Sequence, residues 1–188
     1  DGGEYWLRTL AHADVTDRYL SWLRDPDVVR FLEVRFTEPS AENVAAYVSS
    51  FDNTNTFLFG IYAKPSDMHI GNISLKIDPN HKTAWHGTMI GDKDYWGRGA
   101  SEAAHKLLIN FAFGELGLRK LYAGVNVRNV AAIFNLRHLG YSQEALLRKH
   151  YCFQDEYIDA KYFSLFRDTW DDHNNNISPI GDHGKSAE

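Results

Sequence analysis

The spacing of apolar residues along the chain predicts a mixed succession of strands and helices. Alternating or continuous apolar runs predict strands at residues 5–10, 57–63, 69–77, 83–90, 121–127 and 161–166. Residues 146–158 are expected to be extended, with a turn at 154–156. Helical spacing predicts helices after Asp14, after Ser40, directly after Gly99 and over residues 129–139. The pattern favours one mixed α/β domain over residues 1–170 and a flexible tail over 171–188.

Two polar residues stand where helix N-caps are expected. Asp14 precedes a stripe made by Val15, Tyr19 and Leu23, and Ser40 precedes a second amphipathic stretch. Short oxygen-bearing side chains at these positions accept bonds from the free amides of the first helical turn. We therefore expect helices to begin just after Asp14 and just after Ser40.

Composition narrows the possible setting without naming an activity. The 188 residues are 44% hydrophobic and carry a net charge of −5, which gives no electrostatic reason to expect nucleic acid as a partner. Cys152 is the one cysteine, so no intrachain disulfide can form, and this fits a reducing, cytoplasmic compartment. No apolar run is long enough to span a bilayer, so no membrane partner is expected, and no metal site is expected.

The segment Trp96-Gly97-Arg98-Gly99-Ala100 joins an apolar strand to an amphipathic helix. Two glycines allow the backbone to turn sharply and to approach a ligand closely. The amides from Trp96 to Ser101, with the positive end of the helix dipole and the cation of Arg98, suit a pyrophosphate. A sharp strand-to-helix turn without a ligand would use the same glycines, so the pair alone is weak evidence. The spacing fits neither a Walker loop nor the full dinucleotide fingerprint.

Several stretches around this turn resemble a known family. They are residues 70–73 (IGNI), 90–103 (IGDKDYWGRGASEA), 126–129 (NVRN), 138–141 (HLGY) and 150–151 (HY). Together they resemble the GNAT superfamily of acetyl-CoA-dependent N-acetyltransferases. Within it they are most similar to the branch of ribosomal-protein alanine N-acetyltransferases and bacterial amino-sugar N-acetyltransferases.

The resemblance implies a fold and a cofactor site. The fold would be a mixed, mostly antiparallel central sheet with flanking helices, in which strands 83–90 and 121–127 are parallel but splayed. The pantetheine arm of acetyl-CoA would lie in the splay and pair with the main chain of Met89, Ile90 and Gly91. The pyrophosphate would bind the turn from Trp96 through Gly97, Arg98, Gly99 and Ala100 to Ser101. The side chain of Asn129 would bond the cofactor arm, and as an alternative or additional role it would cap the following helix.

The catalytic groups common in this family are replaced here. Many members of the family have a tyrosine that acts as the general acid seven residues after the motif asparagine; here that position is Leu136. The serine common in the branch, three residues after the asparagine, is Ala132 here. The branch's strand glutamate falls in a stretch that reads Ala84-Trp85-His86-Gly87 here. Histidine side chains ordinarily titrate near neutrality, so His86 is our candidate general base, with a purely structural histidine as the alternative. Tyr151 and Tyr157 are weaker candidates, and His105 is expected to be exposed.

The acceptor is the least determined part of the reaction. Glu33 and Arg35 occupy a loop that borders the acceptor pocket in this fold, and Trp85 offers an aromatic surface. Glu33 would hold an ammonium group, and Arg35 a phosphate or carboxylate, with a salt-bridged surface loop as the alternative. We expect a small-molecule primary amine, with a nucleotide-linked amino sugar preferred. A protein N-terminus and a non-catalytic acyl-CoA-binding module remain alternatives, and the protein is expected to be a monomer or a homodimer.

Overall fold

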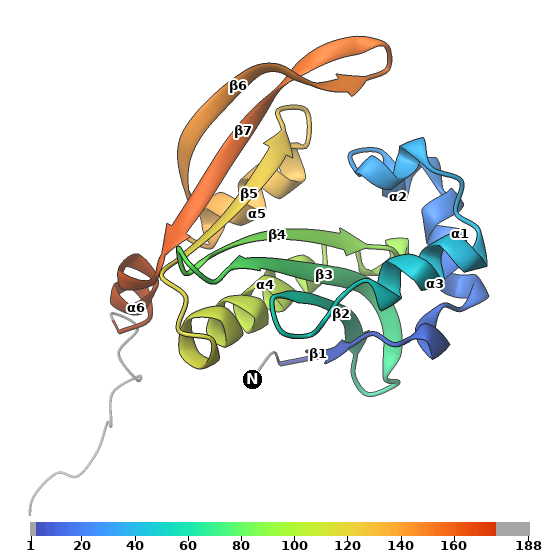
Figure 1. Ribbon diagram of the computed structural model, residues 1–188, viewed down its shortest axis with the longest axis horizontal. Helices are drawn as coiled ribbons and strands as arrows, with labels where there is room; N and C mark the ends of the chain where they lie inside the picture. The colour runs from blue at the N-terminus through green and yellow to red at the C-terminus, as the bar shows by residue number, and fades with distance from the viewer. Residues whose placement is uncertain (1–2, 176–188) are drawn as a thin grey trace, which may run out of the picture.

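The computed structural model describes residues 3–175, which form a seven-stranded mixed sheet with helices on both faces (Figure 1). The strands are β1 (Tyr5–Thr9), β2 (Thr56–Ala63), β3 (Met68–Asp78), β4 (Thr83–Ile90), β5 (Lys120–Asn126), β6 (Ser142–Phe153) and β7 (Glu156–Phe166). The α-helices are α1 (Asp17–Arg24), α2 (Pro26–Val29), α3 (Ala41–Ser49), α4 (Ala100–Asn110), α5 (Val130–His138) and α6 (Arg167–Asn175). Short helical turns form η1 (His12–Asp14), η2 (Glu33–Phe36), η3 (Lys93–Tyr95) and η4 (Phe111–Glu115).

The sheet order is β1-β2-β3-β4-β5-β7-β6, and its one parallel pair is β4–β5. This pair is short: it begins with Thr83 opposite Lys120 and ends with Trp85 opposite Tyr122. Beyond it the two strands diverge, and the sheet opens into a V in Figure 1. The expected splayed parallel strands are therefore confirmed, and β4 has the bounds predicted from the sequence.

Apolar side chains form a core on each face of the sheet. The larger core packs α4 and α5 against the central strands, with Leu108, Leu121 and Phe163 fully buried. The smaller core packs α1 to α3 on the opposite face, where Val44 contacts the cluster that includes Leu58 of β2. Burying each such side chain contributes on the order of 2 kcal/mol. The larger core therefore supports both diverging strands from the α4 side, whereas the smaller core contains no residue of β5.

The helix starts agree with the sequence in one case and differ in the other. Ser40 caps α3, because its Oγ accepts from the amide of Asn43 at 3.1 Å. The first helix begins at Asp17 and is capped by Thr16, so the expectation that Asp14 caps it is wrong. Asp14 instead accepts from the amide of Ala11 at 2.7 Å, one turn earlier in the chain.

The C-terminal region is more regular than its sequence suggests. The expected turn at 154–156 is confirmed, because Gln154 and Asp155 have positive φ between β6 and β7. The two strands pair as one long hairpin, where two separate extended segments were expected. Residues 171–175, expected at the start of a tail, belong to α6, which Trp170 anchors by donating from Nε1 to Asn110 Oδ1 at 3.3 Å. Positions 176–188 of that expected tail lie outside the described residues.

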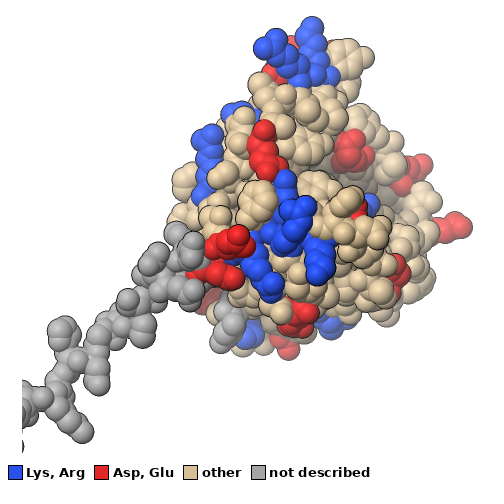
Figure 2. All heavy atoms as spheres, turned by 60° about the vertical axis from the view of Figure 1, so that its left-hand side comes forward, with Lys and Arg blue, Asp and Glu red and all other residues tan. Residues whose placement is uncertain are grey.

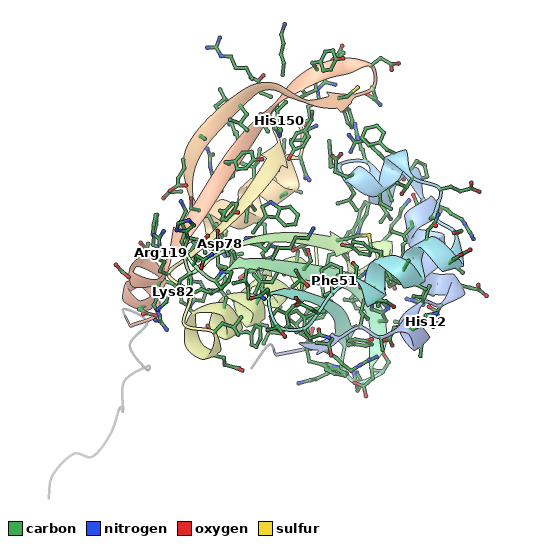
Figure 3. All side chains as sticks on the ribbon, in the orientation of Figure 1. His12, Phe51, Asp78, Lys82, Arg119 and His150 are labelled. Carbon is green, nitrogen blue, oxygen red and sulfur yellow. The ribbon has the colours of Figure 1, made fainter. Side chains whose placement is uncertain are left out.

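Charged side chains gather at the end of the molecule beside α6 (Figure 2). Asp78, Lys82 and Arg119 lie at this end in Figure 3, and Arg119 Nε donates to the carbonyl of His81 at 2.9 Å. Strands β4 and β5 are paired here and diverge toward the other end, so this face lies away from the open part of the splay. No helix in the described part of the chain is both long and apolar enough to cross a membrane.

Candidate active site

One edge of β4 lacks a neighbouring strand. On its other edge β4 pairs with β3 along its whole length, up to Ile90 opposite Gly71. Its pairing with β5 ends at Trp85, so residues 86–90 present an unpaired edge to the splay. Such an edge offers backbone donors and acceptors to an extended ligand. Met89, Ile90 and the start of Gly91, expected to hold the cofactor arm, lie along it.

The glycine turn follows directly. Gly97 and Gly99 have φ of 71° and 76°, in the left-handed region that glycine adopts at little cost. A Cβ at either position would meet open space, so backbone conformation, not crowding, requires glycine there. Trp96 fixes the turn to the end of β4, because its Nε1 donates to the carbonyl of Ile90 at 2.9 Å.

The turn presents unused donors at the start of a helix. In the described part of the chain, the amides of Gly97, Gly99 and residues 100–102 have no hydrogen-bond acceptor, and Gly99 caps α4 without a side chain. The eleven-residue helix places its positive end here, and the exposed side chain of Arg98 adds a cation. The turn therefore has the properties of a pyrophosphate site.

A buried polar network supports the first turn of α4 from behind. His105 Nδ1 donates to the carbonyl of Ser101 at 2.7 Å, so its Nε2 accepts from the Thr88 hydroxyl at 3.1 Å. Asn135 of α5 donates to the Ser101 hydroxyl at 3.2 Å. The expectation that His105 is exposed is wrong, because it points inward from α4 and is 5% exposed. The network ties the turn to β4 and α5.

His86 lies on this same inner side of the sheet. Its ring packs edge-on against His105 and Tyr141, with centroids 5.2 and 5.4 Å away, and it is 1% exposed. Neither ring nitrogen has a hydrogen-bond partner. Burial, with a smaller contribution from His105, holds the pKa of His86 well below its ordinary value. A general base must reach the attacking amine, and a ring sealed in this way does not suit that role.

The opposite face of the splay carries aromatic side chains over glycines. A Cβ on Gly124 of β5 would lie 2.9 Å from Tyr162 Cζ and 3.2 Å from the Tyr151 hydroxyl. A Cβ on Gly87 of β4 would lie 2.9 Å from the ring of Trp85, which is half-buried on the same face. Trp85, Tyr151 and Tyr162 therefore line the side of the splay that faces away from α4.

The Tyr151 hydroxyl lies on this face, against Gly124 of β5. Burial raises its pKa, Tyr162 and Glu33 raise it further, and Arg35 opposes them. The hydroxyl therefore stays protonated at neutral pH. His150 packs edge-on against Tyr151 at 4.9 Å, and Figure 3 places it on the β6–β7 hairpin. Tyr157, the other tyrosine considered from the sequence, is 71% exposed and points outward.

The loop expected to border the acceptor contacts this hairpin. Arg35 donates from Nη2 to the carbonyl of Cys152 at 2.7 Å and from Nη1 to Leu32. Phe31 stacks on Phe153 with ring centroids 5.3 Å apart. The acceptor side of the splay is therefore bridged by two segments that lie far apart in sequence. Glu33 stands on the bridge with its carboxylate largely exposed.

Asn129 marks the end of the cofactor side. Its Oδ1 accepts from the amide of Ala132 at 3.2 Å, so the expected helix cap is confirmed. The NH2 group of the Asn129 side chain takes no part in this cap.

Among the described residues, no group of three His, Cys, Asp or Glu side chains is arranged to hold a metal ion.

Comparison with known proteins connects this geometry to a family. The family model described as an acetyltransferase (GNAT) domain matches residues 5–142. The chain belongs to the GNAT family of N-acetyltransferases. This GNAT acetyltransferase is 32% identical over 163 residues to N-acetyltransferase p20 of Bacillus licheniformis, a match that covers 84% of this chain and 89% of that relative.

Spermidine acetyltransferases are also similar to this GNAT enzyme. The spermidine N(1)-acetyltransferase of Escherichia coli K12 is 34% identical over 93 residues, which is 50% of each chain. The crystal structure of spermidine N-acetyltransferase from Vibrio cholerae in complex with CoA and spermine has a TM-score of 0.79 and covers 89% of this chain and 98% of that one. At 19% identity this likeness shows the fold alone.

The glycine–aromatic contacts of this GNAT enzyme are the feature that sequence reasoning missed. A side chain on Gly91 would overlap the ring of Trp22, and Tyr162 lies against Gly124. The partners come from α1 and β7, so no local pattern reveals them. Only Trp85 and Gly87, two residues apart on one strand, carried a signal, since alternate strand residues share a face.

Proposed function

We propose that this GNAT enzyme transfers the acetyl group of acetyl-CoA to the primary amine of a small molecule, with a nucleotide-linked amino sugar as the preferred acceptor. The observation that carries the proposal is the unpaired edge of β4 at 86–90, which ends in a turn with free amides at a helix start. An extended arm with a pyrophosphate at one end matches both parts. The single cysteine fits a cytoplasmic setting.

The reaction needs two proton movements. The uncharged amine nitrogen attacks the thioester carbonyl, and the C–N bond forms as the C–S bond breaks. The proton released by the amine passes to water, and the departing thiolate takes a proton from a donor that water then reprotonates. Tyr151 is proposed as the donor to the thiolate, supported by its protonated hydroxyl on the acceptor face. Glu33 attracts the ammonium from the bridge. His86 is left out of these steps because its ring is sealed.

A protein N-terminus is a poorer acceptor for this site. A basic peptide requires an open and acidic groove, whereas the acceptor side is bridged from Arg35 to Cys152 and by Phe31 on Phe153. A polyamine is the second candidate, because similar proteins are named for spermidine and one is bound to spermine. Of the bridge residues, only Glu33 would favour such a cation.

A turnover assay over a panel of acceptors tests the proposal. Release of free CoA from acetyl-CoA is followed with nucleotide-linked amino sugars, spermidine and N-terminal peptides. We expect the amino sugars to give the highest kcat/KM. Tight CoA binding without turnover of any amine would contradict the proposal and support a non-catalytic acyl-CoA-binding module.

Tyr151→Phe tests the proton donor. We expect kcat to fall by about 10²-fold, the range for loss of a general acid, with CoA affinity unchanged. Tyr157→Phe is the matched control on the neighbouring strand, since Tyr157 is exposed. A Tyr151→Phe enzyme with the wild-type kcat would remove Tyr151 from the mechanism.

A further inference from the structure

A cavity of about 530 Å³ lies next to the acceptor bridge. It is formed where the end of α1, α2 and η2 meet the turn of the β6–β7 hairpin, which lie on the same side of the molecule in Figure 1. Its walls are Leu23, Arg24, Pro26, Val29, Arg30, Arg35, Thr37, Pro39, Phe153 and Gln154. The charged residues in this wall are all arginines.

These arginines are poorly neutralised. Arg24 donates to the carbonyl of Pro39 at 3.4 Å, and Arg30 lies over the rings of Phe31 and Phe153. Within residues 3–175 neither forms an ion pair with a carboxylate. Arg35 has one, Glu33 at 3.7 Å, whose largely exposed carboxylate is screened by water.

Of the carboxylates next to the wall in sequence, Asp25 and Asp27 are ion-paired, and Glu38 has no ion pair within the described residues. Asp25 and Asp27 both bind Lys93 of η3, each at 2.7 Å. They flank Pro26 of the cavity wall and share that one lysine, which neutralises one of their two charges. The charged side chains that line the cavity itself are Arg24, Arg30 and Arg35, and three like charges around one space repel one another until an anion enters.

The shape of the cavity selects the kind of anion. Its volume is within the range of small-molecule sites, about 300–1,000 Å³. One guanidinium group can donate to two oxygens of a phosphate at once, so several arginines around one space suit a diphosphate. Leu23, Val29 and Phe153 add apolar and aromatic wall for a ring beside the phosphates. A polyamine would be repelled here.

We propose that the cavity lined by Arg24, Arg30 and Arg35 binds the diphosphate group of the acceptor substrate. The inference rests on the proposed small-molecule acetyltransfer and specifies its acceptor as a diphosphate-linked amine. Arg35 connects the two places: it lines the cavity and bonds the carbonyl of Cys152, the residue after Tyr151. The amine end of the acceptor extends from the cavity toward Tyr151 and the splay.

Binding of uridine 5′-diphosphate and of inorganic pyrophosphate tests the cavity. Titrations are made with CoA present at saturation, so that the glycine turn is filled. We expect the wild type to bind uridine 5′-diphosphate, and the Arg24→Gln/Arg30→Gln double variant to bind it at least tenfold more weakly. Both arginines are exposed, so the variant is expected to fold. Arg148→Gln, an exposed arginine on the same hairpin, is the matched control.

Steady-state kinetics test whether the diphosphate bound in the cavity belongs to the acceptor substrate. We expect uridine 5′-diphosphate to compete with the acceptor and not with acetyl-CoA, and the double variant to raise the acceptor KM at nearly unchanged kcat. Equal affinity in wild type and double variant, or inhibition that is not competitive with the acceptor, would overturn the inference.

Failure of the inference differs from failure of the proposed function. Turnover of amines without phosphate, together with no binding of either diphosphate probe, overturns the inference and leaves the acetyltransferase proposal standing. Arginine-dependent diphosphate binding with no turnover of any amine overturns the proposed function, while the cavity is retained as an anion site.

Discussion

Replacing His86 with leucine is expected to flatten the pH dependence of folding and to leave acetyl transfer intact. His86 is 1% exposed, neither of its nitrogens has a partner, and burial holds its pKa well below 6.5. In the unfolded chain the ring protonates near 6.5, so below that pH the unfolded state holds one more proton than the folded state. The stability contributed by a neutral His86 is therefore present above pH 6.5 and is lost as the pH falls.

The size of the effect follows from proton linkage. One extra proton in the unfolded state changes the free energy of unfolding by about 1.4 kcal/mol per pH unit, or up to about 2 kcal/mol between pH 7 and pH 5. His105 and His69 also have pKa values lowered by burial, so the wild type loses stability through all three rings. His86→Leu removes one of them. It also removes an unsatisfied buried polar group, so stability at pH 7 is expected to be equal or higher.

Urea unfolding from pH 5 to pH 8, followed by tryptophan fluorescence, measures the effect. We expect the pH slope of the variant to be smaller by the amount of one histidine. Identical slopes for wild type and variant would refute the account of His86 as a neutral buried ring. Loss of turnover in a fully folded His86→Leu enzyme would restore it as a catalytic group.

Substitutions at three further positions separate the cofactor side from the acceptor side. Gly99→Ala forces a φ of 76° on a residue with a Cβ, which costs about 1–2 kcal/mol, so calorimetry should show weaker CoA binding. Unchanged CoA affinity would contradict the assignment of the glycine turn as the CoA site. Gly124→Ala brings a Cβ to 2.9 Å from Tyr162 and should raise the acceptor KM at constant CoA affinity; an effect on CoA alone would place the acceptor elsewhere. Asn129→Ala should lower the free energy of unfolding by about 1 kcal/mol through loss of the helix cap, whereas Asn129→Ser keeps the cap. If Asn129 also bonds the cofactor, both variants should bind CoA more weakly. Full CoA affinity in the serine variant would reject that bond.

Local signals in the sequence predicted much of the fold. The alternation in 83–90 gave β4 its bounds, and Ser40 marked the start of α3, because strand period and N-cap chemistry act within a few residues. Where two candidates compete, local rules are less decisive: Thr16, not Asp14, caps α1. The helix α6 depends on Trp170 docking against α4, which no local pattern encodes.

Within the site, too, local features could be predicted from the sequence, whereas features that depend on tertiary packing could not. The glycine turn and the Asn129 cap could be predicted, because positive φ and capping leave a mark on residue type. The burial of His105 and the sealing of His86 depend on packing between α4, β4 and Tyr141, so residue type alone suggested an exposed His105 and a catalytic His86. The arginine cavity needs α2 and the β6–β7 turn to meet, and these are distant in sequence.

The structure of this GNAT enzyme with CoA bound tests the central claim most directly. We predict the pyrophosphate on the free amides of Gly97, Gly99 and residues 100–102, and the pantetheine arm bonded to the unpaired edge of β4 between residues 86 and 90. A pyrophosphate bound away from the glycine turn, or an arm that makes no backbone bonds to β4, would contradict it.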